Sequence, residues 1–277
     1  MPSSLKIPDW IKVQDFNRTD YAKTLGKLKG VNTVCMSANC PNRYECFANS
    51  TATFMILGDT CTRNCKYCAV KSGLPNLIDL SEPKKIAKIA KDLNLKYVVI
   101  TCVSRDDLKD GGASVFIETV REIRKLLPKI KIELLISDLN GNWDALNQII
   151  KENPYVLNHN IEVVRSLFPT LRPKGDYLRS LELLKKCKIV SKSGLMVGLG
   201  ETEVEIMETL QDLRNVHVDI ITIGQYLQPS KDHAQVKKYY TPNEFKVLAK
   251  KAKTLGFKKV FTGPLVRSSY HAQKVAK

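Results

Sequence analysis

The sequence predicts an α/β fold, a partial (β/α)6-type barrel with extensions at both ends of the chain. Short apolar runs recur along the chain, and longer stretches with the hydrophobic spacing of amphipathic helices lie between them. Largely apolar strands joined by helices are typical of buried parallel strands. Polar motifs recur directly after the expected strands, which favours a barrel over a doubly wound sheet.

The expected strands are apolar runs of three to six residues, at 52–57, 97–102, 132–136, 155–157, 195–197, 220–223 and 260–262. The helical patterns lie at 83–93, 113–127, 143–152, 177–191, 202–216 and 242–255. Residues 1–50 are polar and irregular. We therefore expect an N-terminal extension at 1–50, the barrel at 51–262 and a C-terminal segment at 263–277.

The composition is that of an ordinary globular protein. The chain has 277 residues, of which 43% are hydrophobic and 26% are charged. No apolar run approaches the roughly 20 residues that cross a bilayer, and the first residues lack the apolar core of a secretory signal. We therefore expect a cytoplasmic protein without a membrane partner.

The net charge is +16, and it comes from lysines scattered along the whole chain. Such a surplus favours acidic partners, either nucleic acid or an acidic protein that presents a substrate. A solvated, lysine-rich surface explains the charge equally well, so the charge alone decides nothing.

Six of the eight cysteines lie within residues 35–68, which indicates metal ligands rather than disulfides in a reducing compartment. Cys61, Cys65 and Cys68 have the spacing C-x3-C-x2-C directly after the first expected strand. Three thiolates in one short loop, with no fourth nearby, leave one iron of a [4Fe–4S] cluster open for chemistry. The alternative is a structural zinc site that takes a cysteine from the other group.

The second group is Cys35, Cys40 and Cys46, with the spacing C-x4-C-x5-C. Beside a first cluster, this group indicates an auxiliary iron–sulfur cluster that again lacks a fourth cysteine. A zinc site or reduced structural thiols are the alternatives. Cys102 and Cys187 fall within apolar patterns, so we expect them to be core thiols.

The C-x3-C-x2-C loop resembles the signature of the radical S-adenosylmethionine (radical SAM) superfamily. The resemblance implies a radical SAM barrel and a cluster whose open iron binds S-adenosylmethionine, which is then cleaved to a 5′-deoxyadenosyl radical. Tyr67 is the aromatic residue that usually precedes the third cysteine. Its backbone is expected to meet the adenine.

From about residue 8 to residue 272 the chain resembles the lipoyl synthase family. Besides the cysteine groups, the main matching segments are PDWIKV at 8–13, TCVSRDDLKDGGA at 101–113, NHNIE at 158–162, KSGLMVGLGET at 192–202, TIGQYLQP at 222–229 and GPLVRSSYHA at 263–272. The resemblance implies a sulfurtransferase that inserts two sulfur atoms at carbons 6 and 8 of a protein-bound octanoyl-lysine, forming the lipoyl cofactor. It also implies two [4Fe–4S] clusters and two S-adenosylmethionines per product, the auxiliary cluster being the sacrificial sulfur source.

The same resemblance supplies the missing ligand of the auxiliary cluster. Ser269, in the R-S-S-Y segment, is implied to bind its fourth iron, with Ser268 as the second choice. A serine oxygen is a hard, weak ligand beside soft thiolates, which suits a cluster that must come apart. Without the other motifs, a Ser-Ser pair near the end of a chain would indicate a turn or a helix cap.

The implied reaction also names partners. The substrate would be an octanoylated lipoyl domain of a 2-oxoacid dehydrogenase complex or the glycine cleavage H protein, and such acidic domains would suit the positive charge. Electrons are expected from a ferredoxin or flavodoxin, and an iron–sulfur carrier is expected for cluster repair. No nucleic acid is expected.

Four further residues are candidates for contacts with S-adenosylmethionine, from their positions after expected strands or in matching segments: Arg105, Asp106, Asn158 and Arg172. For Arg172 a surface salt bridge is about as plausible. A helix N-cap explains Asp110 better than Arg105. The isolated His233 has no assigned role.

Two other functions compete with this interpretation. A radical SAM methylthiotransferase that acts on tRNA predicts an added RNA-binding domain, for which the chain has no length left. A zinc-ribbon nucleic-acid binder predicts aromatic residues interleaved with basic ones and no long α/β body.

Overall fold

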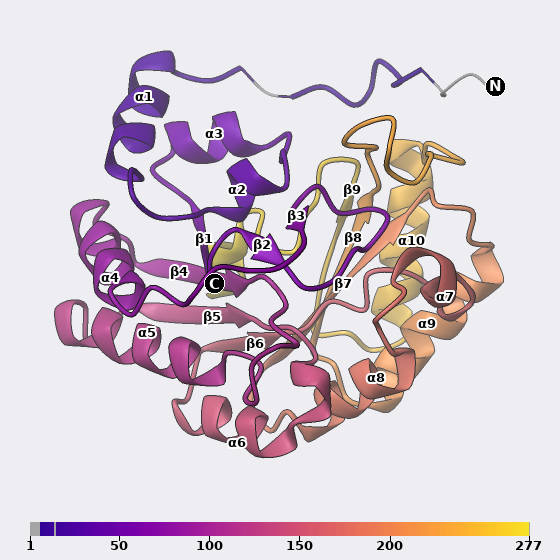
Figure 1. Ribbon diagram of the computed structural model, residues 1–277. Helices are drawn as coiled ribbons and strands as arrows, with labels where there is room; N and C mark the ends of the chain where they lie inside the picture. The colour runs from indigo at the N-terminus through magenta and orange to yellow at the C-terminus, as the bar shows by residue number, and fades with distance from the viewer. Residues whose placement is uncertain (1–5, 14, 277) are drawn as a thin grey trace. The chain divides into compact units, whose positions relative to one another are not determined.

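The computed structural model describes residues 6–13 and 15–276 (Figure 1). It divides into two compact units, each with parallel strands and helices that cover them. The N-terminal unit holds residues 15–63, 70–158 and 269–276, and the C-terminal unit holds residues 6–13, 64–69 and 159–268. In the described ranges, no helix has both the length and the apolar character needed to cross a membrane.

The N-terminal unit is built on four parallel strands that neighbour one another in chain order. They are β1 (Thr53–Ile56), β4 (Tyr97–Cys102), β5 (Lys131–Leu135) and β6 (Val156–Asn158). The helices that follow them lie outside the strands in Figure 1 and are α4 (Glu82–Asp92), α5 (Ala113–Leu126) and α6 (Trp143–Lys151). In α5, Phe116, Val120 and Ile123 are fully buried, so one face of the helix packs on the core.

The C-terminal unit repeats this pattern. Its parallel strands are β7 (Ser191–Val197), β8 (Ile220–Gln225) and β9 (Lys259–Gly263). Its helices are α7 (Phe168–Leu171), α8 (Tyr177–Lys186), α9 (Glu203–Asn215) and α10 (Pro242–Thr254). Both α9 and α10 begin with a capping box, in which a threonine and the glutamate three residues later satisfy each other's backbone N–H groups. Short 3-10 turns complete the two units, at Leu139–Gly141, Arg165–Leu167 and Ala272–Ala276.

All seven expected strands are present, so the prediction of an α/β fold with parallel strands is confirmed. The expected helix at 177–191 is wrong in its second half. Cys187 already has extended backbone angles, and residues from Ser191 onward belong to β7. Apolar residues in 187–191 continue the helical spacing, but residues 187–190 form the connection between α8 and β7, and β7 pairs with β8 from Lys192 onward.

The expectation of an irregular N-terminal region is also wrong. Three helices form there: α1 (Arg18–Lys27), α2 (Val34–Ser37) and α3 (Arg43–Ala48). Asn17 caps α1 by accepting hydrogen bonds from two backbone N–H groups. Packing of aromatic rings supports these helices, with Phe16 stacked on Tyr44 at 5.0 Å and Tyr21 on Phe47 at 5.8 Å. Tertiary contacts therefore stabilise helices that have a weak apolar pattern.

A very short parallel pair, β2 (Thr60–Cys61) with β3 (Lys71–Ser72), was not expected. The nine residues between the two strands contain the rest of the C-x3-C-x2-C motif. The pair therefore closes this loop at its base.

Gly224 of β8 allows the segment after β9 to approach the strand closely. A Cβ atom at this position would lie 2.1 Å from the carbonyl oxygen of Val266, and only a movement of the backbone could relieve this contact. This segment leads directly into the R-S-S-Y motif.

We predict that Gly224→Ala lowers the free energy of unfolding by about 2–3 kcal/mol, because the added methyl group displaces the Val266 backbone. Gly26→Ala is the matched control: nothing lies within 4 Å of its Cβ position, so in the exposed helix α1 it should raise stability by about 0.5 kcal/mol. Urea unfolding of both variants measures the difference. Equal stability of the two variants would contradict the close approach.

Candidate functional site

The loop that carries the C-x3-C-x2-C motif starts at Cys61, the last residue of β2. The carbonyl oxygen of Cys61 accepts a hydrogen bond from Gly73 N at 2.9 Å, and Thr62 N donates to Ser104 O at 3.0 Å. The loop is thus tied to the segment after β3 and to the segment after β4. The Cys61 thiol forms no disulfide, is partly exposed and accepts a hydrogen bond from Arg63 N at 3.4 Å.

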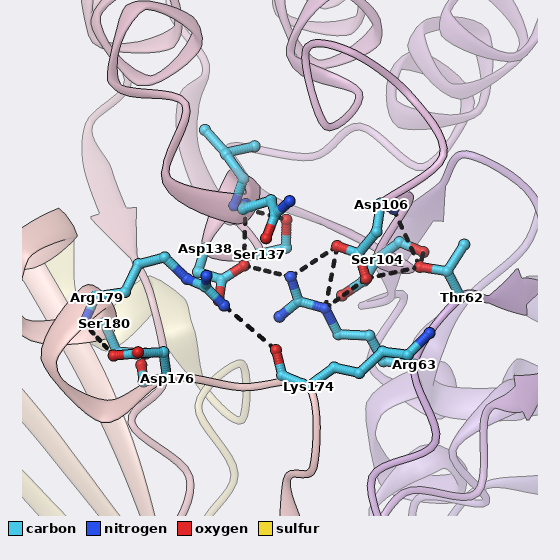
Figure 2. A network of polar contacts seen from close by, with 12 residues as sticks. Thr62, Arg63, Ser104, Asp106, Ser137, Asp138, Lys174, Asp176, Arg179 and Ser180 are labelled. Carbon is cyan, nitrogen blue, oxygen red and sulfur yellow. Dashed lines mark hydrogen bonds and ion pairs between the residues drawn. The ribbon is translucent and has the colours of Figure 1, made fainter.

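Arg63, inside the motif, forms a buried network with two aspartates (Figure 2). Its guanidinium binds Asp106 through two hydrogen bonds of 2.7 and 2.9 Å, and Asp138 through one of 2.6 Å. The side chains of Arg63 and Asp138 are 3% and 0% exposed. Burial lowers the pKa of the guanidinium, but hydrogen bonds with both carboxylates outweigh it and raise the pKa above its usual value. The network fixes the start of the loop on the segments after β4 and β5.

The second part of the motif, residues 64–69, is held by the C-terminal unit. Lys66 N donates to Leu171 O and Ala234 N donates to Lys66 O, both at 2.8 Å. The imidazole Nε2 of His233 lies 3.0 Å from the carbonyl oxygen of Cys68. The Cys65 and Cys68 thiols form no disulfide and are partly exposed.

Tyr67 lies among the side chains that surround this part of the loop. Burial raises the pKa of its phenol well above the usual value, while the nearby Arg172 opposes the shift, and Glu162 and both neighbouring thiols add to it. The phenol is therefore neutral and packed beside Arg172. The expected contact of the Tyr67 backbone with adenine stays a prediction.

Arg105 and Glu82 together hold the turn that leads from β1 into the motif. Leu57 has a positive φ of 71° at this turn. Its N–H donates to Glu82 Oε2 at 2.8 Å, and its carbonyl oxygen accepts from Arg105 Nη1 at 3.3 Å. Arg105, which is 4% exposed, also binds Asp107 through two nitrogens. The structure therefore gives Arg105 a role in holding backbone.

Asp106 is similarly engaged within the protein. Besides Arg63, it accepts a hydrogen bond from the hydroxyl of Thr62 at 3.1 Å. Arg63 Nε also lies 3.2 Å from Oδ1, so hydrogen bonds within the protein already match the four lone-pair positions of this carboxylate. Contact of Arg105 and Asp106 with S-adenosylmethionine stays a prediction.

Asn158 ends β6 with a fully buried side chain. Its Nδ2 donates to Glu133 Oε1 at 2.9 Å, and Glu133 Oε2 accepts from the Tyr97 hydroxyl at 2.6 Å. Within the described residues, Asn158 Oδ1 is buried without a hydrogen-bond partner. A buried acceptor without a partner is costly, so this oxygen fits an amino group of a bound ligand.

Arg172 is buried, at 8% exposure, so the alternative of a surface salt bridge is wrong. Its Nη1 donates to the carbonyl oxygens of Asn160 and Ile161 at 3.1 and 3.4 Å. The Asn160 amide in turn donates to Glu162 and to Ser268 Oγ, at 3.0 and 3.1 Å. Asn160 Oδ1 is a second buried oxygen that has no partner in the described part of the chain.

The second cysteine group lies on α2 and α3 of the N-terminal unit. Cys35 is in α2, Cys40 follows it, and Cys46 is in α3. Burial raises the pKa of Cys35 to about 11, and the neighbouring Cys40 thiol contributes. Burial also raises the pKa of Cys46, and the Cys35 and Cys40 thiols add to that shift. The three thiols are thus close enough to disfavour one another's ionisation unless positive charge, such as that of iron, joins them.

Glu45 joins this group to the C-terminal segment. Its two carboxylate oxygens contact the Tyr270 hydroxyl at 2.8 Å and His271 Nε2 at 3.3 Å. Burial and the Glu45 carboxylate raise the pKa of Tyr270, and the Cys46 and Cys40 thiols add to the shift. The residues after Ser269 therefore lie beside the second cysteine group.

The donor set fits iron–sulfur clusters. None of the six cysteines of the two groups is in a disulfide, and each group offers three soft thiolates. Among the residues that the structure describes, no three His, Cys, Asp or Glu side chains lie close enough to share one metal ion. The thiolates of a cubane each bind a different iron, so they lie further apart than the ligands of a single zinc ion.

The sequence-based interpretation missed several residues of this site: Arg63, Asp138, Glu45, Glu133 and His233. A charged residue inside the short cysteine motif was a signal for Arg63. Asp138 follows an expected strand, which was a weaker signal. Nothing in the sequence marked Glu45 or His233, since their partners are 225 and 165 residues away.

We predict that Arg63→Gln lowers the free energy of unfolding of the cluster-free protein by about 3–5 kcal/mol, because it breaks the ion pair of the fully buried Asp138 carboxylate with Arg63. The double variant Arg63→Gln/Asp138→Asn should recover part of this loss. Lys23→Gln removes an exposed ion pair with Asp20 and should change stability by less than about 1 kcal/mol. Urea unfolding tests all three variants, and an Arg63→Gln protein as stable as Lys23→Gln would refute the role of the network.

Comparison with solved structures identifies the fold. The chain superimposes on methylornithine synthase (PylB) with a TM-score of 0.57 and 15% identity, covering 90% of this chain and 75% of that one. It superimposes on the FeFe-hydrogenase maturase HydG from Carboxydothermus hydrogenoformans with a TM-score of 0.57 and 13% identity, covering 95% and 71%. At such identities the likeness concerns the fold alone.

Comparison of sequences identifies the family. Residues 55–213 match the model of the Radical SAM superfamily. The chain is 50% identical over 278 aligned positions to a lipoyl synthase of Caldanaerobacter subterraneus subsp. tengcongensis, covering 97% of this chain and 96% of that protein. It is 52% identical to a lipoyl synthase of Staphylococcus aureus (strain Newman), covering 98% and 91%. The expected radical SAM fold and the resemblance are confirmed, and the chain belongs to the lipoyl synthase family of the Radical SAM superfamily.

Proposed function

We propose that this protein inserts two sulfur atoms at carbons 6 and 8 of an octanoyl chain, which is carried as an amide on a lysine of a lipoyl domain. The radical SAM family implies a [4Fe–4S] cluster and S-adenosylmethionine. We further propose a second, auxiliary [4Fe–4S] cluster as the source of both sulfur atoms. Two S-adenosylmethionines are consumed, one for each hydrogen removed.

The observation that carries this proposal is the contact of Glu45 with Tyr270 and His271. It supports an auxiliary site in which Cys35, Cys40 and Cys46 supply three ligands and the R-S-S-Y segment supplies the fourth. Ser268 Oγ accepts a hydrogen bond from Asn160, which favours Ser269 as the ligand. A zinc ribbon would not require a contact between the second cysteine group and the R-S-S-Y segment. A tRNA methylthiotransferase is not supported by the relatives, which are named lipoyl synthase and match over nearly their full length.

Cys61, Cys65 and Cys68 would hold the first cluster. With S-adenosylmethionine bound, that cluster supplies a one-electron reductive cleavage that yields methionine and a radical able to abstract hydrogen from an unactivated carbon. The chain's own contribution is to hold these cysteines: Arg63 fixes the start of the loop, and Lys66 fixes its second part through Leu171 and Ala234.

Asn158 and Arg172 would orient S-adenosylmethionine. The unpaired Oδ1 of Asn158 is the acceptor that a methionyl amino group needs, and Glu133 fixes the direction of the amide. Arg172 brings a buried positive charge beside Tyr67, which suits a carboxylate. Arg105 and Asp106 would act mainly by holding the backbone around the cofactor.

The chain order supports the proposed division of labour. Residues 1–50 would supply the auxiliary cysteines, residues 51–262 the radical SAM barrel, and residues 263–277 the serine ligand; positions 1–5, 14 and 277 of these ranges lie outside the described residues. The carrier would be a lipoyl domain of a 2-oxoacid dehydrogenase complex or the glycine cleavage H protein. A ferredoxin or flavodoxin would supply electrons, and an iron–sulfur carrier would rebuild the spent cluster.

We predict that the reconstituted enzyme, with dithionite and S-adenosylmethionine, adds two sulfur atoms to an octanoylated lipoyl domain and to an octanoyl-lysyl peptide. Mass spectrometry measures the mass gain, and chromatography measures 5′-deoxyadenosine. Formation of 5′-deoxyadenosine without any gain of sulfur would show a radical enzyme with a different substrate.

We predict that Ser269→Ala spares the cluster on Cys61, Cys65 and Cys68 but lowers the yield of lipoyl product at least tenfold, because the fourth iron of the auxiliary cluster loses its ligand. Wild-type protein should bind about eight irons per chain, four for each cubane. Ser268→Ala, which removes only the acceptor of the Asn160 hydrogen bond, is the matched comparison and should have a smaller effect. A loss in Ser268→Ala with full yield in Ser269→Ala would move the ligand to Ser268.

A further inference from the structure

Residues 73–80, here called the leucine loop, expose three large apolar side chains. Leu74 and Leu77 are each 97% exposed and Leu80 is 84% exposed. The next most exposed large apolar side chain of the described residues is Val204, at 66%. Single apolar residues on a surface are ordinary, but three almost fully exposed leucines within seven positions are unusual and indicate an interaction site.

Both ends of the leucine loop are fixed. At its start, β3 pairs with β2, and Gly73 N donates to Cys61 O at 2.9 Å. At its end, Asp79 accepts from Ser81 N at 2.8 Å and pairs with Lys85 at 2.8 Å, where α4 begins. The leucines are thus presented from a loop that is hydrogen-bonded to a proposed cluster ligand.

The helix that follows the leucine loop in the chain, α4, carries a row of lysines. Lys84, Lys88 and Lys91 are exposed on α4, and their spacing of four and three residues places them on one face of the helix. The opposite face of α4, with Ile86 and Ala90, is buried. Apolar anchors flanked by positive charge suit a partner that offers an apolar patch within an acidic surface.

We propose that the leucine loop and the Lys84–Lys88–Lys91 face dock the acidic carrier domain that presents the octanoyl-lysine. This inference rests on the proposed function, because a substrate attached to a folded domain requires that the enzyme hold the domain as well as the acyl chain. The hydrogen bond between Gly73 and Cys61 keeps the docked domain next to the cysteine loop. The leucines supply the contact and the lysines steer the encounter.

The test compares a carrier with a peptide. The triple variant Leu74→Asn/Leu77→Asn/Leu80→Asn is assayed as reconstituted holoenzyme on octanoylated lipoyl domain and on a short octanoyl-lysyl peptide. We expect the dissociation constant for the domain to rise at least tenfold, and the ratio of kcat/KM for domain to kcat/KM for peptide to fall by a similar factor. Val204→Asn/Val247→Asn, which replaces exposed apolar residues on α9 and α10, should leave this ratio unchanged.

A second variant tests the charged face. Lys84→Glu/Lys88→Glu/Lys91→Glu should slow association with the domain about tenfold at low salt and flatten its salt dependence. Lys246→Glu/Lys250→Glu/Lys253→Glu on α10 reverses the same number of exposed charges at the same spacing; it is the matched control and should slow association less. Equal effects of the two charge reversals would leave only the net charge of the protein as the cause and would overturn the assignment of this face.

Three other results would overturn the docking surface. Unchanged kcat/KM for both domain and peptide in the leucine variant removes the leucines from docking, and an equal loss of kcat/KM on both places them at the acyl chain or in the fold of the loop. Loss of binding to phosphatidylcholine–phosphatidylglycerol vesicles, or of self-association, with unchanged affinity for the domain would assign the patch to a membrane or to a second copy. If wild-type protein binds the domain through the leucines but modifies neither substrate, the proposed function fails and the docking surface stands.

Discussion

The buried ion pairs of Arg63 with Asp106 and Asp138 are the constraint on which the cysteine loop depends. A loop that offers three thiolates has little regular backbone pairing of its own, and here only β2 and β3 close its base. Arg63 lies between Cys61 and Cys65 and reaches two segments that follow separate strands. Because Asp138 is fully buried, the loop cannot shift without breaking a buried ion pair, which is costly.

Other buried charged side chains also fix backbone near the cysteine loop. Arg105 and Glu82 hold the carbonyl and N–H groups of Leu57, and Arg172 holds the carbonyl groups of Asn160 and Ile161. Backbone groups beyond the end of a strand have lost their ladder partners and need others when they are buried. Charged side chains meet this need with strong hydrogen bonds and fix the backbone that surrounds the proposed cofactor. Polar motifs after strands therefore serve the scaffold as much as the ligand.

The features that could be predicted from the sequence are those that depend on residues close together in the chain. Strands, most helix limits and the two cysteine groups follow from periodicity and spacing, and all seven strands were found. The helices of the N-terminal region were missed because packing of Phe16, Tyr21 and Tyr44 supports them, and such contacts leave no periodic signal. Residues 187–191 were misassigned because a local helical pattern does not show where the chain must leave the helix to enter the next paired strand. The contacts of Arg63 with Asp138 and of Glu45 with Tyr270 join residues 75 and 225 positions apart, which one sequence cannot reveal.

The two halves of the proposed auxiliary site offer donors of different strength. Cys35 and Cys46 lie in helices that pack through aromatic rings and through the pairing of Thr33 with Phe54. The carboxylate of Glu45 joins this part to the C-terminal segment by binding Tyr270 and His271. A serine ligand in this segment would be a hard, weak oxygen donor, whereas the thiolates are soft donors on a packed scaffold. The serine would therefore be the ligand that the cluster loses most easily, and the three thiolates would be the ligands that hold it.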